Sequence, residues 1–596
     1  MRAQPLLGAS IVLLLAASCI VDSGHTVGAG SDEPVRLAAS REAAEDEIYG
    51  PLPEGCTCIM VGRLASADGS VITSHTCDGR YRTWIDVVEG KKHKEGALAE
   101  IFKGRMKTEV PTDRRGVTVL GTIPQVAETF TIFDTAYPCM NEHQLAMGES
   151  TFGGRPGLQS KKGLFYIEEL QRIALERTRT ARDAIRLMGA LATEHGYIDS
   201  GEALAVADPE EVWHFEILGP GKDALGAVWA AVRIPDDHVG VMANICRIGT
   251  LDLEDSENCM ASKNVISLAV EKGWYDPAKG EPFKFWKAYS GRRPFRVREW
   301  WVFDQLAPSL DLNYLKTSEL PLSVKPDDKV SVEDVFELFR ATYDGTDYAL
   351  NRNLVIPKGS VPPSGLRPLT KKGGEPNAQG RAAESVETLD KVRRADLAEE
   401  SMGQGNGAAR MEVCHWAHPW LSRDQQSLFN TLKPGTITFH RPIAVMFNAY
   451  HTVIQCRHWL PDPVGGICWL GFDNPATSPR APIFAGVTDL PADFKIDNHK
   501  KYRTDSASWA FRRASRLATI RWGKNKARLE EKIIALEKQA LADLPDLERR
   551  AAELLEKDPA AARDYLTRYT MSFCRAMTHQ FWELGDELWM DYLYYL

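Results

Sequence analysis

The sequence changes character abruptly at Cys56, and this change constrains the fold more than any other feature. Residues 20–55 are polar and acidic and show no core-forming pattern, which is typical of a leader rather than a domain. Directly afterwards, residues 58–62 predict a strand, residues 66–70 a turn and residues 71–73 the returning strand. A β-hairpin therefore begins at, or immediately after, Cys56.

The segments after the hairpin alternate between helical and strand patterns. Apolar residues recur at helical spacing over residues 163–194, which predicts a long amphipathic helix with a break near 178–180. Short strands are predicted at 212–218, 228–234 and 239–243. Hairpin, helix and further strands in this order predict an α+β layered domain.

The second half of the chain contains an insertion, further strands and a helical region. Residues 356–410 are rich in Gly, Pro, Lys, Glu and Gln, which predicts an exposed insertion in a main domain that spans 56–490. Residues 503–596 are helical in pattern, and their C-terminal aromatic residues either pack on the main domain or form a subunit contact. The sequence therefore leaves open whether the chain forms a homo-oligomer. Strand character returns at 436–439, 443–447, 452–456 and 466–470.

The N-terminus predicts export. Arg2 precedes an apolar stretch at residues 6–17 that is too short for a stable membrane span and ends in small residues, as a secretory signal within residues 1–19 does. Residues 16–19, AASC, resemble a bacterial lipobox, although Ala stands where Leu is usual. We expect a periplasmic or extracellular protein, and the one membrane link that the sequence leaves open is a lipid on Cys19 of the precursor.

Charge argues against nucleic acid as the main partner. The chain has 596 residues, a formal net charge of -9 and a pI of about 5.9. No global basic field exists to attract phosphates.

Cys56 and Cys58, one residue apart, are the first chemical feature of the hairpin. A zinc site normally needs a second pair or histidines at compatible spacing, and the sequence nearby predicts neither. A cysteine at the start of a strand is more often a small core residue than a nucleophile. Gly55 favours the nucleophile, because glycine has no Cβ to obstruct attack on its carbonyl by the following thiol. An N-to-S acyl shift and hydrolysis would then release Cys56 with a free α-amine.

A free α-amine on Cys56 suits general base catalysis. Its unperturbed pKa is about 7.7–8.0, so a useful fraction is neutral near pH 7. One residue then holds both the nucleophile and its base, as in N-terminal threonine hydrolases. Attack on an amide gives an oxyanion and then a thioester that water hydrolyses. This chemistry needs a carboxylate to orient the amine and donors to hold the oxyanion.

The run CTCIMVGRLASADGS at residues 56–70 resembles the opening of the cysteine dipeptidase family of N-terminal-nucleophile hydrolases, typified by lactobacillar dipeptidase A. Secernins are relatives of that family, and bile-salt hydrolase and penicillin V acylase are more distant ones. The resemblance extends over most of residues 56–490. It continues through PCMNE at 138–142, DPEEVW at 208–213, RIPDD at 233–237 and WLPDP at 459–463.

The resemblance implies four site residues. Cys56 matches the nucleophile, and Asp78 falls where relatives keep a carboxylate near the N-terminal amine. Asn141 matches an asparagine associated with the oxyanion hole or the substrate, and Asn244 resembles a second asparagine of the acylase branch. Asp78 could instead cap a turn, and the two asparagines could satisfy loop backbone.

One position departs from the acylase branch. His75 stands where those relatives have arginine, three residues before Asp78. Arg441 or Arg457 could supply the missing basic group, but the sequence places neither in the site. His451 suggests a Cys–His dyad, which the α-amine makes unnecessary.

The resemblance implies a dipeptidase with the four-layer αββα fold of N-terminal-nucleophile hydrolases, a C-terminal helical region, and no metal or other cofactor. Two alternatives stay open. One is a non-peptide amidase or acylase on the same fold, since fold and nucleophile do not fix the acyl group. The other is a secreted binding protein without catalysis.

Overall fold

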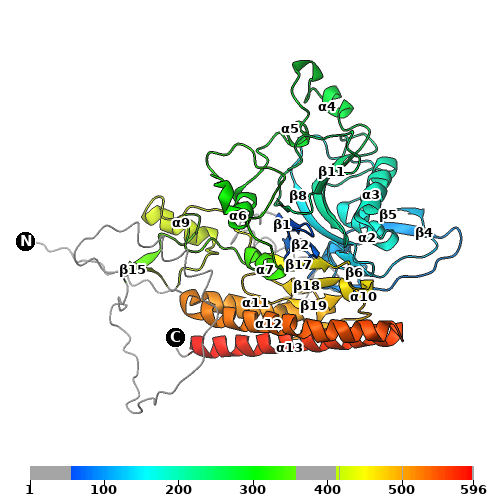
Figure 1. The fold of residues 1–596 in the computed structure, drawn as a ribbon. Coiled ribbons are helices and arrows are strands. Elements are labelled where there is room, and N and C mark those ends of the chain that lie inside the picture. The colour runs from blue at the N-terminus through cyan, green and yellow to red at the C-terminus, as the bar shows by residue number, and fades with distance from the viewer. Residues whose placement is uncertain (1–54, 358–410, 415, 498, 500, 594–596) are drawn as a thin grey trace, which may run out of the picture. The chain divides into compact units, whose positions relative to one another are not determined.

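In a computed structural model, two large β-sheets organise the described part of the chain (Figure 1). The predicted targeting segment, the leader up to residue 54 and nearly all of the predicted insertion lie outside it. Among the described residues, no helix combines the length and the apolar character that crossing a bilayer requires. The structure describes residues 55–357, 411–414, 416–497, 499 and 501–593.

The Cys56 hairpin lies at the centre of a seven-stranded sheet, in which every ladder between neighbouring strands is antiparallel. The last strands come from the other end of the domain, so residues far apart in sequence meet beside the hairpin. The strand order is β14 (Ser323–Val324), β12 (Val239–Met242), β1 (Gly55–Val61), β2 (Val71–Asp78), β17 (Asn448–Cys456), β18 (Ile467–Phe472) and β19 (Ala481–Phe484).

A second sheet has eight strands, also antiparallel. Its order is β13 (Cys259–Ala261), β11 (Val228–Ile234), β10 (Val212–Leu218), β9 (Gly201–Ala207), β8 (Ala146–Phe152), β7 (Met140–Asn141), β6 (Ile132–Asp134) and β3 (Asp86–Val88).

The two sheets pack face to face through β1 and β2 on one side and β8 and β9 on the other. Gly148 permits the close approach, because a Cβ there would lie 2.3 Å from the Ser74 carbonyl oxygen of the facing sheet. Helices cover both outer faces (Figure 1): α2 (Ile167–Arg177) and α3 (Ala181–His195) pack on the second sheet. On the first sheet lie α11 (Ala507–Thr519), α12 (Trp522–Leu555) and α13 (Pro559–Leu593). The predicted α+β fold with four αββα layers and a C-terminal helical region is confirmed.

The remaining elements are short and lie in the connections. They are β4 (Leu98–Lys103), β5 (Thr118–Pro124), β15 (Val355–Pro357), β16 (Met411–Val413), α4 (Ser267–Glu271), α5 (Phe285–Tyr289), α6 (Val297–Leu306), α7 (Val332–Phe339), α9 (Arg423–Leu432) and α10 (Asp462–Gly465).

Most predicted elements exist at the predicted places. The long helical pattern divides into α2 and α3 because Thr180 caps a new helix, its side chain accepting the amide of Asp183 at 3.2 Å. Of the aromatic residues near the C-terminus, Phe581 packs on the domain against Phe511 of α11, whereas Trp589 is 44% exposed. Tyr594 and Tyr595 lie outside the described residues.

The strands predicted at 436–439 and 443–447 are wrong. These residues form a loop that leads into β17, and their apolar alternation comes from burial without strand pairing. Their backbone groups bond outside any sheet: the indole of Trp420 donates to the Ala444 carbonyl at 2.9 Å, and the amide of Ile437 donates to the side chain of Asn430. This loop carries Arg441 toward β2.

Candidate active site

Cys56 is the second residue of β1 and lies almost completely inside the protein, with 2% of its surface exposed. The register pairs it with Cys77 and pairs Gly55 with Asp78 across the hairpin. The end of β2 therefore places a carboxylate beside the Gly55–Cys56 peptide bond.

Asp78 is a buried carboxylate held by three donors. Its Oδ2 accepts from Arg441 Nη2 at 2.6 Å and from the Thr76 hydroxyl at 3.2 Å, and its Oδ1 accepts from Asn448 Nδ2 at 2.7 Å. Charge-assisted bonds of this length fix the carboxylate strongly. Of the two arginines that the sequence left open, Arg441 is thus the one at the site.

Asn244 contacts Cys56 directly. Its Oδ1 accepts the Cys56 amide at 2.9 Å, and its Nδ2 donates to the Thr151 carbonyl at 2.7 Å, which fixes the orientation of the amide group. The residue has φ 60°, in the left-handed region that asparagine tolerates better than most residues. This backbone conformation lies directly after β12 and turns the chain at the site.

Arg298, from α6, completes this side of the site. One of its amino groups donates to the Cys56 carbonyl at 2.7 Å and to the Thr57 hydroxyl at 2.9 Å, and the other donates to Asn244 Oδ1 at 2.8 Å. Burial, and then repulsion by Arg441, lower its pKa to about 9, so the guanidinium keeps its charge at neutral pH.

Gly55 leaves no room for a side chain. A Cβ at this position would lie 2.8 Å from Arg441 Nη2 and 2.9 Å from Asn244 Oδ1. The Gly55 carbonyl oxygen lies 3.5 Å from the same Arg441 nitrogen. The residue before Cys56 is therefore enclosed by the same groups that surround the nucleophile.

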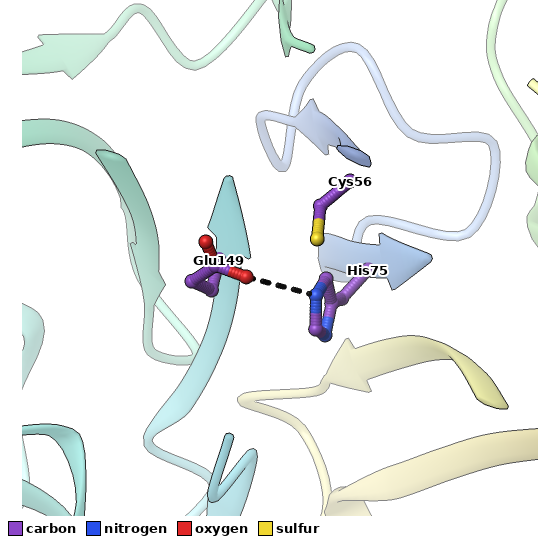
Figure 2. A group of neighbouring side chains, drawn as sticks. All are labelled: Cys56, His75 and Glu149. Carbon is purple, nitrogen blue, oxygen red and sulfur yellow. Dashed lines mark ion pairs between the residues drawn. The ribbon is translucent and has the colours of Figure 1, made fainter. Parts of the chain in front are cut away.

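Cys56, His75 and Glu149 form a cluster between the two sheets, which we call the nucleophile cluster (Figure 2). His75 comes from β2 and Glu149 from β8, and their Nε2 and Oε2 atoms lie 3.4 Å apart. One donor atom from each of the three residues lies within 4.8 Å of the other two. His75 therefore lies beside the thiol of Cys56.

Protonation in this cluster follows from burial and charge. Burial, and then the negative charge of Glu149, raise the pKa of the Cys56 thiol well above its ordinary value. Burial alone would also raise the pKa of Glu149, but contacts with His75 and Glu202 lower it, while burial and the charge of Glu149 raise the pKa of Glu202. Glu149 is therefore the anion and Glu202 carries the proton. The thiol stays neutral at pH 7 and needs a base to react.

The structure does not bring Asn141 together with Cys56, Asp78 and Asn244. Its Nδ2 donates to the carbonyls of Leu175 and Thr178, and its Oδ1 accepts the amides of His143 and Leu145. The side chain is fully used by backbone groups of its own turn and of the C-terminal end of α2, which agrees with the alternative that it satisfies backbone. No contact of Asn141 with the site supports its predicted role in the oxyanion hole.

Two other residues from the sequence also lie elsewhere. Arg457 pairs with Glu548 and donates to carbonyls at 464 and 465, away from the site. His451 is buried on β17 with its Nδ1 on the Asp473 carbonyl at 3.2 Å, so the contacts support no Cys–His dyad with it.

Sequence reasoning missed Arg298, Asn448 and Glu149. Arg298 follows Val297 at the start of a short helix, and nothing in its spacing marks it. Glu149 follows the apolar residues 145–148 but precedes Ser150 and Thr151, so little in the local pattern marks it as a buried carboxylate.

The comparison with protein families decides the assignment. The sequence profile of peptidase family C69 matches residues 55–357 and 423–534, well over half of the chain. The chain belongs to peptidase family C69. The resemblance found in the sequence is confirmed, and the C69 chain is an enzyme that hydrolyses peptide bonds.

Curated relatives of this C69 chain carry consistent names. A "Probable dipeptidase" of Salmonella dublin is 30% identical over 315 residues, covering 49% of this chain and 67% of the relative. A "Probable dipeptidase" of Latilactobacillus sakei is 24% identical over 82% of this chain and 90% of its own length. A "Probable dipeptidase B" of Streptococcus pyogenes serotype M1 is 22% identical over 85% and 87%.

Proposed function

We propose that this chain is a cysteine dipeptidase that acts through a thioester on Cys56, with the freed α-amine of Cys56 as general base. One observation carries the proposal: the backbone nitrogen of Cys56 already lies 2.9 Å from Asn244 Oδ1, inside the enclosure formed by Arg298, Arg441 and Asp78. The names of the relatives support dipeptides as the substrate class.

The first step of the proposal releases the leader. The Cys56 sulfur attacks the Gly55 carbonyl carbon, the C–N bond breaks, and the leader becomes a thioester on sulfur while the nitrogen takes a proton and becomes the α-amine. Arg441, 3.5 Å from the Gly55 oxygen, stabilises the negative charge that develops there. Water then hydrolyses the thioester, which frees the leader as a carboxylic acid and restores the thiol.

The mature site repeats this chemistry on a dipeptide. The α-amine takes the thiol proton, sulfur attacks the amide carbonyl carbon, and the C–N bond breaks as the amine gives the proton to the leaving amino acid. Water then hydrolyses the thioester, which releases the other amino acid and restores the thiol. Arg298 and Arg441 disfavour an ammonium ion at this position and so favour the neutral amine that a general base must be. Because burial raises the pKa of the Cys56 thiol, this proton transfer is required rather than incidental.

Removal of the leader also bears on localisation. We propose export, with processing before Cys56 separating the enzyme from any lipid on Cys19. Cell fractionation with an antibody to the C-terminal helices tests this: the mature chain is expected in the exported fraction, and a cytoplasmic mature chain contradicts the proposal.

The test of function is a substrate panel with the mature protein. Dipeptides are expected to be hydrolysed, and Cys56→Ala is expected to hydrolyse none. Cleavage of acyl-amino acids without dipeptides would favour the amidase alternative, and no cleavage of either would favour a binding protein.

Gly55→Ala tests the processing step separately. The added methyl group has to displace Arg441 or Asn244, so leader release is expected to slow at least about tenfold, while enzyme that has already matured turns over normally. Gly55→Ala processing at the wild-type rate would contradict the proposed step.

A further inference from the structure

We propose that the nucleophile cluster is a binding site for one zinc ion, in which zinc holds the Cys56 sulfur and reversibly blocks the peptidase. The ligands are Cys56 Sγ, a ring nitrogen of His75 and a carboxylate oxygen of Glu149. In the described part of the chain, no other group of three such residues has its donor atoms within 4.8 Å of one another.

The atoms that would bind the metal are not used in hydrogen bonds. Both ring nitrogens of His75 and Oε2 of Glu149 are buried without a hydrogen-bond partner, while 1% of His75 and none of Glu149 is exposed. Buried polar atoms are nearly always paired, and here one ring nitrogen of His75 and one carboxylate oxygen of Glu149 lie within 4.8 Å of each other and of the Cys56 sulfur, as the ligands of one ion would.

The spacing fits a metal better than a hydrogen bond. His75 Nε2 and Glu149 Oε2 lie 3.4 Å apart, longer than a normal hydrogen bond between nitrogen and oxygen. Two ligands with bonds of about 2.0–2.2 Å to a tetrahedral zinc ion lie about 3.3–3.5 Å apart. The pair therefore already has the separation of one edge of a zinc tetrahedron.

Ligand type and charge identify the ion. Sulfur and imidazole ligands favour zinc over magnesium or calcium, which prefer oxygen. On binding, the Cys56 thiol loses its proton to solvent, so one thiolate and one carboxylate balance the two charges of the ion. A neutral complex is what a buried site requires.

A second cluster of the same residue types provides the control. Cys246, His214 and Glu216, which we call the loop cluster, are equally buried. Glu216 already accepts the amide of Arg247 at 2.5 Å, the ring of His214 at 3.0 Å and the thiol of Cys246 at 2.9 Å. Its carboxylate has no ligand position left for a metal.

Zinc titration of the purified, chelator-treated protein by calorimetry tests the site. One zinc per chain is expected, with the affinity falling at least about tenfold in His75→Gln and in Glu149→Gln and unchanged in His214→Gln. Zinc that binds both nucleophile-cluster variants as it binds wild type would overturn the proposal, as would a wild-type chain that binds none.

Cobalt(II) gives a second readout that does not depend on the variants folding. Wild-type protein is expected to show a sulfur-to-cobalt charge-transfer band, which disappears when Cys56 is alkylated with iodoacetamide before cobalt is added. A band that survives alkylation of Cys56, or no band in wild type, contradicts the site.

Inhibition by zinc, unlike zinc binding, rests on the proposed function. Failure of the zinc site and failure of the proposed function give different results. Binding that follows the variants, in a protein without dipeptidase activity, would overturn the inhibition and the proposed function but leave the zinc site. Dipeptide hydrolysis that zinc leaves unchanged, while zinc fails to bind, would overturn only the zinc site.

Discussion

The nucleophile cluster and the loop cluster contain the same three residue types, are both buried, and differ in what already occupies their carboxylate. In the loop cluster, Glu216 accepts two backbone amides, an imidazole and a thiol, and so fixes the chain after β12. In the nucleophile cluster, Glu149 accepts the Thr151 hydroxyl at 2.9 Å, contacts the protonated Glu202 and faces His75 at 3.4 Å, but it binds no backbone amide through its side chain among the described contacts. The free capacity of the carboxylate, rather than the residue types, separates a reactive site from a structural one.

The two clusters also differ in how the fold assembles them. Glu216 and His214 lie two residues apart on β10, and the loop after β12 adds the rest. The nucleophile cluster needs both sheets, because β8 supplies Glu149 while β1 and β2 supply the other two residues. The reactive cluster therefore exists only after the two sheets have packed.

The largest expected difference comes from the two cysteines. Cys56→Ala removes the nucleophile and is expected to lower kcat at least about a thousandfold. Cys246→Ala is expected to keep kcat within about twofold and to lower the free energy of unfolding by about 1–3 kcal/mol, since a thiol contact and its volume are lost. Steady-state dipeptide hydrolysis and denaturant unfolding check both variants. Equal losses of activity in Cys56→Ala and Cys246→Ala would contradict the difference between the two clusters.

The two carboxylates are expected to behave in opposite ways. Glu216→Gln weakens charge-assisted bonds to backbone amides and is expected to lower the free energy of unfolding by about 1–3 kcal/mol, with normal hydrolysis by the folded fraction. Glu149→Gln is expected to lower kcat about tenfold or more through the loss of the His75 partner, with a smaller effect on unfolding. A Glu149→Gln protein that is unstable but fully active would contradict this assignment.

The smallest expected effect is on thiol reactivity. Burial, followed by the charge of Glu149, raises the pKa of the Cys56 thiol. The rate of its alkylation by iodoacetamide should therefore be low at neutral pH and should still increase at pH values above the ordinary pKa of a thiol. Glu149→Gln removes a charge that raises this pKa and is expected to move the profile to lower pH. Glu216→Gln is expected to leave it unchanged. Peptide mapping by mass spectrometry assigns the modified cysteine.

Local pattern was sufficient to predict much of the fold. The strands predicted at 212–218 and 228–234 have the bounds of β10 and β11, because alternation and turn residues act within one element. The same alternation wrongly predicted strands within residues 436–447, where the chain forms a partly buried loop. The loop's geometry depends on contacts with distant segments, such as the bond from Tyr343 to the Arg441 carbonyl, and a local pattern does not encode them.

The site was predictable where the family resemblance supplied the residues. Asp78 lies at the end of the same hairpin as Cys56, whereas Asn244 lies 188 residues away and reaches the nucleophile because β12, the strand before it, pairs with β1. Arg298 and Glu149 arrive through helix and sheet packing. Asn141 shares a motif with the family but ends β7 with its whole side chain bonded to backbone groups, so the motif alone could not give its role.

The mass of the purified chain tests the central claim most directly. Wild-type protein with dipeptidase activity is expected to begin at Cys56, and Cys56→Ala is expected to retain the residues before it, because the thiol that releases them is absent. Full activity in wild-type chains that still carry residues 20–55 would contradict the account, since no free α-amine would then exist at Cys56.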